Sequence, residues 1–217
     1  MRSSLRRKSE PTGWLAIGLI AILNVGVFLL AMADGGQRLS YWVERWGWQV
    51  DILNAPIHWA MLLPNALTAS FLHLSWAHLL GNIAFLLLLG PQLERRIGVL
   101  ATLLAYLFFA TAANLLATVA VNDLPEPLVG SSGAVAGFMG AYLALFPFRR
   151  IGIYLPLGVY LHPIKAPGAL LIGMWFGVQL LYGWLGDDIS PLSWRVHIAG
   201  FGLGLFVGLG VFSRLKH

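Results

Sequence analysis

Apolar stretches of this sequence contain a few serine, histidine and asparagine side chains that can do chemistry. Ser132 belongs to the tetrapeptide GSSG at 130–133, where a loop turns into an apolar run. The first N–H groups of a helix lack partners within the helix, and the helix dipole favours negative charge there. A serine at this point can expose its hydroxyl while neighbouring N–H groups receive an oxyanion. Taken by itself, the motif has a structural alternative to this catalytic interpretation: the serine could be the N-cap of a glycine-rich helix that packs against its neighbours.

His197 is the second residue with catalytic potential, because it heads a stripe of glycines. Gly200, Gly204 and Gly208 follow it at offsets that place them on one helical face. The run after Ser132 has a similar stripe, formed by Gly133, Gly137 and Gly140. Faces of small residues let two helices approach closely in a membrane. We therefore expect the two stripes to pack together and to bring His197, a general base, beside Ser132.

His78 and Asn82 are four residues apart and predict a pair of hydrogen-bond donors one helical turn apart. An asparagine amide and a neutral histidine can both donate to an oxyanion. The alternative is that they satisfy each other or bond a neighbouring helix. His73 is expected nearer the membrane interface, where it would shape a loop.

Other polar residues near the apolar runs are expected to be structural. Asn114 and Gln179 are expected to form hydrogen bonds between helices. The acids of the outer loops could include a partner that orients His197, but the spacing favours none of them; they are Asp123, Glu126, Asp187 and Asp188.

The three candidate residues share one predicted depth. Ser132, His197 and His78 each precede an inner basic residue (Arg149, Arg214 or Arg95) by 17 positions. At 1.5 Å per residue this separation is about 26 Å. All three therefore fall just inside the outer face of a hydrocarbon core about 30 Å thick. Asn82 lies about one turn deeper. Unrelated structural residues need not share a level, whereas the parts of one site must.

The composition explains why so few polar residues stand out. Of 217 residues, 58% are hydrophobic and only 11% are charged, against about 25% charged residues in soluble domains. This excludes a soluble enzyme or a disordered chain and predicts an all-α membrane protein. Runs long enough to span a bilayer predict a six-helix bundle that forms one domain at 13–213. The expected spans are 14–33, 76–91, 99–121, 132–148, 167–185 and 194–212.

Charge placement predicts the orientation of these spans. With the N-terminus in the cytoplasm, inner segments hold eleven of fourteen basic residues and only two of nine acids, as the positive-inside rule requires. The basic charge then needs no nucleic-acid partner. Segments 1–12 and 214–217 are expected in the cytoplasm. The long outer connection at 34–67 carries four tryptophans and is expected to lie in the membrane interface. The first span is expected to be a retained helix.

The same residues exclude several membrane activities. No aspartate or glutamate lies in the middle of a span, so an intramembrane aspartyl protease is excluded. The chain has no HExxH motif and no cysteine, which removes a zinc metalloprotease and a cysteine nucleophile. A channel or transporter remains an alternative, although the polar cluster occupies one level and does not form a path across the membrane.

Several motifs occur in an order that identifies a known family. They are His73 with HLLGN at 78–82, ERRIG at 94–98, GSSGAVAG at 130–137 and HIAG at 197–200. With these motifs the chain resembles, over about 67–212, the rhomboid intramembrane serine proteases in their compact six-helix bacterial form. The resemblance implies an endopeptidase that cuts single-span membrane proteins near the outer face of the bacterial cytoplasmic (inner) membrane. It implies no cofactor and no metal.

The resemblance also implies a role for each candidate residue. Ser132 would be the nucleophile and His197 the general base. His78, Asn82 and the backbone N–H of Ser132 would form the oxyanion hole. A catalytically inactive relative that binds membrane clients is the alternative function. The chain departs from the family pattern at Ala136, where some members have an aromatic residue that packs on the histidine, so His197 must be positioned in another way. A second departure is Gly81, where some members have a bulky aromatic residue.

Overall fold

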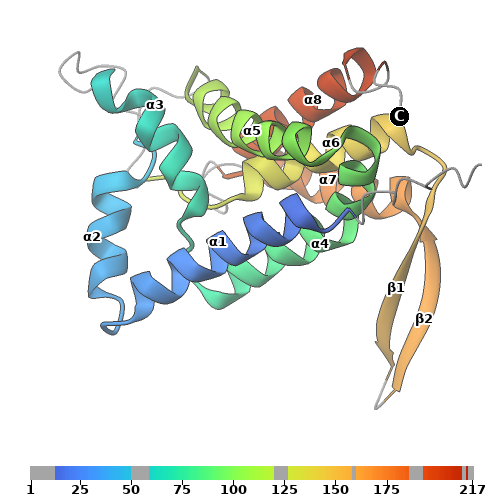
Figure 1. Ribbon diagram of the computed structural model, residues 1–217, viewed down its shortest axis with the longest axis horizontal. Helices are drawn as coiled ribbons and strands as arrows, with labels where there is room; N and C mark the ends of the chain where they lie inside the picture. Colours follow the sequence, from blue (N-terminus) through green and yellow to red (C-terminus); the bar gives the residue numbers. More distant parts are fainter. Residues whose placement is uncertain are drawn as a thin grey trace, which may run out of the picture.

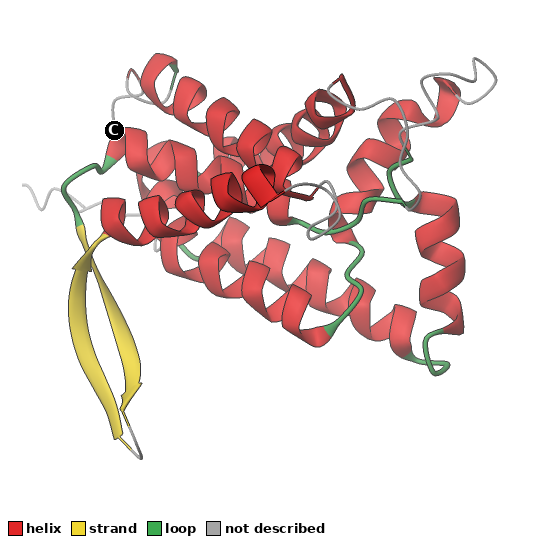
Figure 2. Cartoon of the chain, turned by 180° about the vertical axis from the view of Figure 1, so that it is seen from behind, coloured by secondary structure: helices red, strands yellow, loops and turns green. Residues whose placement is uncertain are grey.

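The computed structural model describes residues 13–49, 59–119, 127–157, 160–185, 193–211 and Arg214 as a helical protein with one β-hairpin (Figures 1 and 2). The helices of its first half are α1 (Leu15–Met32), α2 (Gln37–Trp46), α3 (Trp59–Thr68), the 3-10 helix η3 (Ala69–Phe71), α4 (Trp76–Ile97) and α5 (Val99–Val119). The second half contains α6 (Ser132–Leu145), strands β1 (Arg150–Leu157) and β2 (Tyr160–Pro167), α7 (Gly168–Leu185) and α8 (Ser193–Gly210).

Four of the helices are long and apolar enough to cross a membrane: α1, α4, α5 and α7. Two shorter apolar helices, α6 and α8, pack among them. This is the architecture of a multi-pass membrane protein. The count of six spans therefore stays a prediction, because α6 has only 14 residues.

Helix α6 forms the centre of the bundle, and every residue from Gly133 to Tyr142 is buried. It lies among α4, α5 and α8, with the closest approach to α8. A Cβ at Gly200 would clash with the carbonyl oxygen of Gly133, and a Cβ at Gly204 would clash with that of Gly137. The prediction that the glycine stripes of these helices pack together is thus confirmed. The close approach depends on residues without side chains.

Glu94 joins the C-terminal end of α4 to the start of α1. Its carboxylate accepts hydrogen bonds from the backbone N–H groups of Leu15 (3.0 Å) and Ile17 (3.1 Å), and the residue is fully buried. These N–H groups are among the donors that a helix N-terminus leaves without partners, and the dipole there favours an anion. Along the same interface, the side chain of Ile17 fills the space that a Cβ at Gly90 would take. Glu94 therefore fixes α1 against α4.

Replacing Glu94 by alanine is expected to lower the thermal unfolding temperature of the purified protein, because the N–H groups of Leu15 and Ile17 lose their acceptor and the N–H of Ile17 is buried. Each unsatisfied buried group costs about 1–3 kcal/mol. Glu94→Gln keeps one acceptor oxygen, so its unfolding temperature should fall less than that of Glu94→Ala. Unfolding in detergent, followed by helical circular dichroism, measures both effects. Equal stability of Glu94→Ala and the wild type would contradict this role.

The long connection at 34–67 contains helical structure where it is described. Helix α2 stands at the end of the molecule opposite the hairpin (Figures 1 and 2). Trp48 follows this helix, is fully buried, and exchanges two backbone hydrogen bonds with Leu128 (2.9 and 2.8 Å). The connection thus contacts the segment that leads to Ser132. The predicted placement of this connection in the membrane interface stays a prediction.

The connection at 150–167 differs from the all-α prediction, because it forms the antiparallel hairpin β1–β2. The hairpin pairs apolar and β-branched residues, such as Ile153 with Ile164, and these favour strands. Two span boundaries also differ. Helix α4 continues beyond Pro91, and its last residue is Ile97. The following residue, Gly98, caps the helix with a φ of 85°, which favours glycine. Helix α6 stops at Leu145 and not at residue 148, since Pro147 disfavours helical geometry at the residue before it.

Candidate functional site

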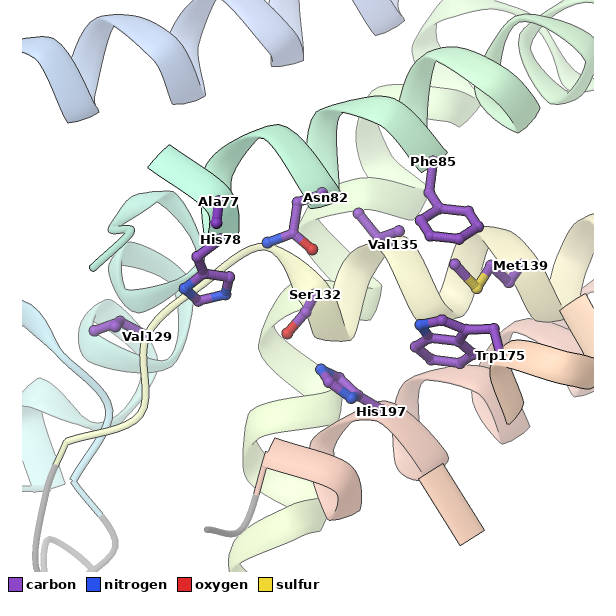
Figure 3. A pocket seen from close by; sticks show the side chains of 11 residues that line it. Ala77, His78, Asn82, Phe85, Val129, Ser132, Val135, Met139, Trp175 and His197 are labelled. Atoms are coloured by element: carbon purple, nitrogen blue, oxygen red, sulfur yellow. The ribbon is translucent and has the colours of Figure 1, made fainter. Parts of the chain in front are cut away.

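A cavity of about 380 Å³ gathers the polar residues that the sequence singled out. Ser132, His197, His78 and Asn82 all lie on its wall (Figure 3). The remaining wall is mostly apolar and includes Phe85, Val135, Met139 and Trp175. The residues come from α4, α6, α7 and α8, which are distant in the sequence. The common depth of these residues in the membrane stays a prediction, and α6 and α8 end before Arg149 and Arg214, so neither helix covers all 17 positions.

The position of Ser132 follows from the way its preceding segment is fixed. Gly130 donates its backbone N–H to the carbonyl of Ala69 (2.9 Å) and has a φ of 121°, which only glycine adopts without strain. A Cβ at Gly130 would also meet the imidazole ring of His78. Ser131 is the N-cap of α6. Ser132 is therefore the first residue of α6, with unpaired backbone N–H groups around it.

His197 reaches Ser132 because α6 and α8 approach so closely. In Figure 3 the hydroxyl of Ser132 points toward the ring of His197. The preceding residue, Val196, is buried and fills the space beside Gly133. The Nδ1 atom of His197 lies 2.7 Å from the Oε1 atom of Gln179 in α7. Because Oε1 can only accept, Nδ1 carries the hydrogen and Nε2 keeps its lone pair. The imidazole thus has the tautomer that a general base needs.

Two side chains of α7 contact His197, and neither contact was predicted from the sequence. Gln179 was expected to form a hydrogen bond between helices, and this is confirmed. The sequence did not predict that the partner of Gln179 would be His197. The ring of Trp175 lies 5.4 Å from the imidazole, centroid to centroid, one turn before Gln179. The spacing of four residues between Trp175 and Gln179 places both on one face of α7, and this was the signal in the sequence that could have linked them. The acids considered as partners of His197 (Asp123, Glu126, Asp187 and Asp188) lie outside the described residues.

On the other side of Ser132, His78 and Asn82 project from α4 (Figure 3). The amide nitrogen of Asn82 lies 3.2 Å from Nε2 of His73. An amide nitrogen only donates, so one of its two hydrogens is directed at His73 and the other stays available. Nε2 of His73 also lies 3.2 Å from the hydroxyl of Ser131. His73 therefore links the turn before Ser132 to Asn82, a role that sequence reasoning left open.

Asn114, the other residue expected to be structural, lies away from the cavity. Its amide donates to the carbonyl of Ala66 (2.8 Å) and connects α5 with α3. This confirms the expected hydrogen bond between helices.

His73 is expected to make the protein less stable in acid. It lies in the connection before α4, where burial and, to a smaller extent, the neighbouring His78 lower its pKa to about 4. The unfolded chain binds this proton near pH 6.5. Between these values the unfolded state holds more protons, so stability is complete above pH 6.5 and decreases as the pH falls toward 4. The measurement is the fall in unfolding temperature between pH 7 and pH 5, which should shrink in His73→Asn.

The matched control for this experiment is His162→Asn, because His162 is exposed on strand β2. That variant should keep the full fall between pH 7 and pH 5. A fall of wild-type size in His73→Asn would contradict the role of His73.

Comparison with known proteins gives one consistent family. The family model described as the Rhomboid domain matches residues 62–214. The putative rhomboid protease YdcA of Bacillus subtilis (strain 168) is 36% identical over 84 residues, covering 39% of this chain and 42% of that protein. Rhomboid-related protein 2 of Mus musculus is 30% identical over 222 residues, covering 98% of this chain and 68% of that protein.

A third relative is the rhomboid protease GlpG of Serratia proteamaculans (strain 568), which is 29% identical over 210 residues. That match covers 94% of this chain and 64% of that protein. The chain thus spans less than two thirds of the length of both the Bacillus and the Serratia proteins. The matched region, residues 62–214, contains all the residues of the cavity wall. The family model covers most of the chain, which therefore belongs to the rhomboid family.

Proposed function

We propose that this protein is an intramembrane serine endopeptidase that cleaves transmembrane segments of other membrane proteins. One observation carries the proposal: Ser132 points at His197 inside a shared cavity, and His197 donates Nδ1–H to Gln179. A serine hydroxyl needs a neighbouring base to become a nucleophile. Relatives named rhomboid proteases add support.

The proposed reaction is acyl transfer in two steps. The hydroxyl oxygen of Ser132 attacks the scissile carbonyl while Nε2 of His197 takes the proton. The tetrahedral intermediate collapses when His197 gives this proton to the leaving amine, which departs and leaves an acyl ester on Ser132. Water then attacks the ester and transfers a proton to His197. Collapse of the second intermediate releases the carboxyl product and returns the proton to Ser132.

Three donors would stabilise the negative oxygen of both intermediates: the side chains of His78 and Asn82 and the backbone N–H of Ser132. The first two lie on α4 and the third at the start of α6, on the wall of the same cavity (Figure 3). Hydrogen-bond donors that are already in place before the reaction stabilise the developing negative charge more strongly in a site that excludes most water than they would in bulk water. The mechanism uses side chains and backbone groups of this chain and needs no cofactor.

The lipid-facing side of α4 offers a route for a substrate segment. Gly81 lies on the cavity wall and is exposed, and a Cβ there would meet no atom within 4 Å. The apolar part of the wall, with Phe85, Val135 and Met139, suits an apolar partner. We infer that the substrates are single-span membrane proteins and that the enzyme resides in the bacterial inner membrane with both termini in the cytoplasm. The charge distribution of the sequence supports this orientation.

Cleavage of a model single-span substrate by purified protein in detergent tests the proposal. The cut should map to the outer part of the substrate segment. A fluorophosphonate probe should label the wild-type protein and fail to label Ser132→Ala. Binding of the substrate without cleavage or labelling would instead identify an inactive, client-binding member of the family. An ion or solute flux through reconstituted protein without labelling would identify a channel or transporter.

A further inference from the structure

Gln179 is the polar side chain of α7 that faces the bundle. It is buried, whereas its neighbours in sequence, Val178 and Leu180, are exposed. Ile172, Trp175 and Gln179 recur at spacings of three and four, so they form one face of α7. Ile172 packs in the core, and the other two contact His197. Two neighbouring turns of the inward face of α7 are thus directed at one imidazole ring.

The 2.7 Å contact between Oε1 of Gln179 and Nδ1 of His197 determines two properties of the base. It fixes which nitrogen carries the hydrogen, because a carbonyl oxygen accepts only from N–H. It also restricts rotation of the ring about its last side-chain bond, which otherwise has a broad minimum. Trp175 lies against the ring 5.4 Å away, with a 46° angle between the planes. The two contacts constrain the ring through one nitrogen and one face.

Helix α6 does not offer an alternative support. Position 136, four residues after Ser132, is an alanine whose methyl group lies 3.3 Å from the place that a Cβ at Gly200 would take. It is too small to cover an imidazole ring. The other titratable side chain on the cavity wall is His78 from α4, and Arg195 is the nearest charged residue along α8. A guanidinium cannot accept from Nδ1–H, because it only donates. His78 lies on the other side of Ser132 from His197 (Figure 3).

We propose that Gln179 is the positioning residue of His197 and takes the place that an orienting carboxylate has in other serine hydrolases, with Trp175 supporting the ring. This inference rests on the proposed function. Gln179 touches neither the substrate nor the reacting atoms, and acts by holding Nε2 toward Ser132. A neutral amide orients the ring without adding a buried charge, which would be costly inside a membrane.

The test compares Gln179→Leu, which removes the acceptor, with Gln179→Glu, which keeps it. We expect Gln179→Leu to lower kcat on the order of 10²-fold, since a misplaced catalytic group costs that much, and to leave KM unchanged. In Gln179→Glu the carboxylate stabilises the protonated imidazole, so the pKa of the base rises. The rising limb of its pH–rate profile should therefore move to higher pH, with cleavage retained above it.

Asn114→Leu is the matched control, because Asn114 also makes one buried hydrogen bond between helices, but away from the cavity. It should lose thermal stability while its folded protein keeps the wild-type kcat. A second readout without turnover is ¹⁵N-histidine NMR of Ser132→Ala. His197 should show protonated Nδ1 and free Nε2, and adding Gln179→Leu should mix the two tautomers.

The failure of this inference is distinguishable from failure of the proposed function. If the wild-type protein neither cleaves substrate nor reacts with a fluorophosphonate at Ser132, the proposed function fails. If the wild type is active and Gln179→Leu has the same kcat and the same rising limb of the pH–rate profile as the wild type, the inference about Gln179 is overturned and the function stands. An equal fall of kcat in Gln179→Leu and Asn114→Leu, measured per folded molecule, would also overturn it.

Discussion

Ser132→Ala and His197→Ala should each reduce substrate cleavage by about 10⁴-fold or more, because a serine hydroxyl and its base act as one unit. The remaining groups can still bind the substrate and donate to its carbonyl oxygen, but they cannot form the acyl ester. The double variant should be no slower than the slower single variant. The rate of product formation from a fluorescent single-span substrate in detergent measures all three.

Stability is the necessary control for this experiment. Ser132 is the first residue of α6, and its hydroxyl faces the cavity. Replacing it by alanine should therefore leave the unfolding temperature close to that of the wild type. His197→Ala loses contacts with Trp175 and Gln179 and should be somewhat less stable. Proteolysis at the wild-type rate by either folded variant would refute the roles of both residues.

The elements that carry the cavity were predictable because the membrane leaves few alternatives. A chain with little charge must satisfy its backbone groups internally, so long apolar runs become helices. Four such helices were found close to their expected ranges. The glycine stripes of α6 and α8 were also readable, since a small-residue face in an apolar helix indicates a close helix contact. That contact accounts for the proximity of Ser132 and His197.

The supporting contacts were not predictable, because they depend on helix rotation and on pairs distant in sequence. Gln179 precedes His197 by 18 residues, and no local pattern fixes which face of α7 meets α8. Glu94 accepts hydrogen bonds from a helix almost 80 residues away. The hairpin was missed for a different reason: its strands lie in a connection, where apolar residues and prolines indicate a loop as readily as a strand.

Asn82→Ala and His78→Ala are expected to show the second largest effects. Removal of one oxyanion donor costs about 10²–10³-fold in kcat, or 2.7–4 kcal/mol of transition-state stabilisation. Both side chains lie on the cavity wall beside Ser132. The effect should appear in kcat and not in KM, because the donors bind the developing negative charge more strongly than the neutral carbonyl. Steady-state cleavage kinetics separate the two parameters.

The bond between Asn82 and His73 gives this prediction a sharper form. If His73 directs one hydrogen of the Asn82 amide, the other is held toward the oxyanion, and loss of His73 should weaken the same donor. His73→Ala should then lower kcat in the wild type but cost much less in an Asn82→Ala background. A double-mutant cycle measures this coupling, and neighbours that share a network typically show 0.5–3 kcal/mol. Additive losses would mean that Asn82 is oriented independently of His73. In that case the contact between His73 and Ser131, which fixes the turn before Ser132, would account for the effect of His73 by itself.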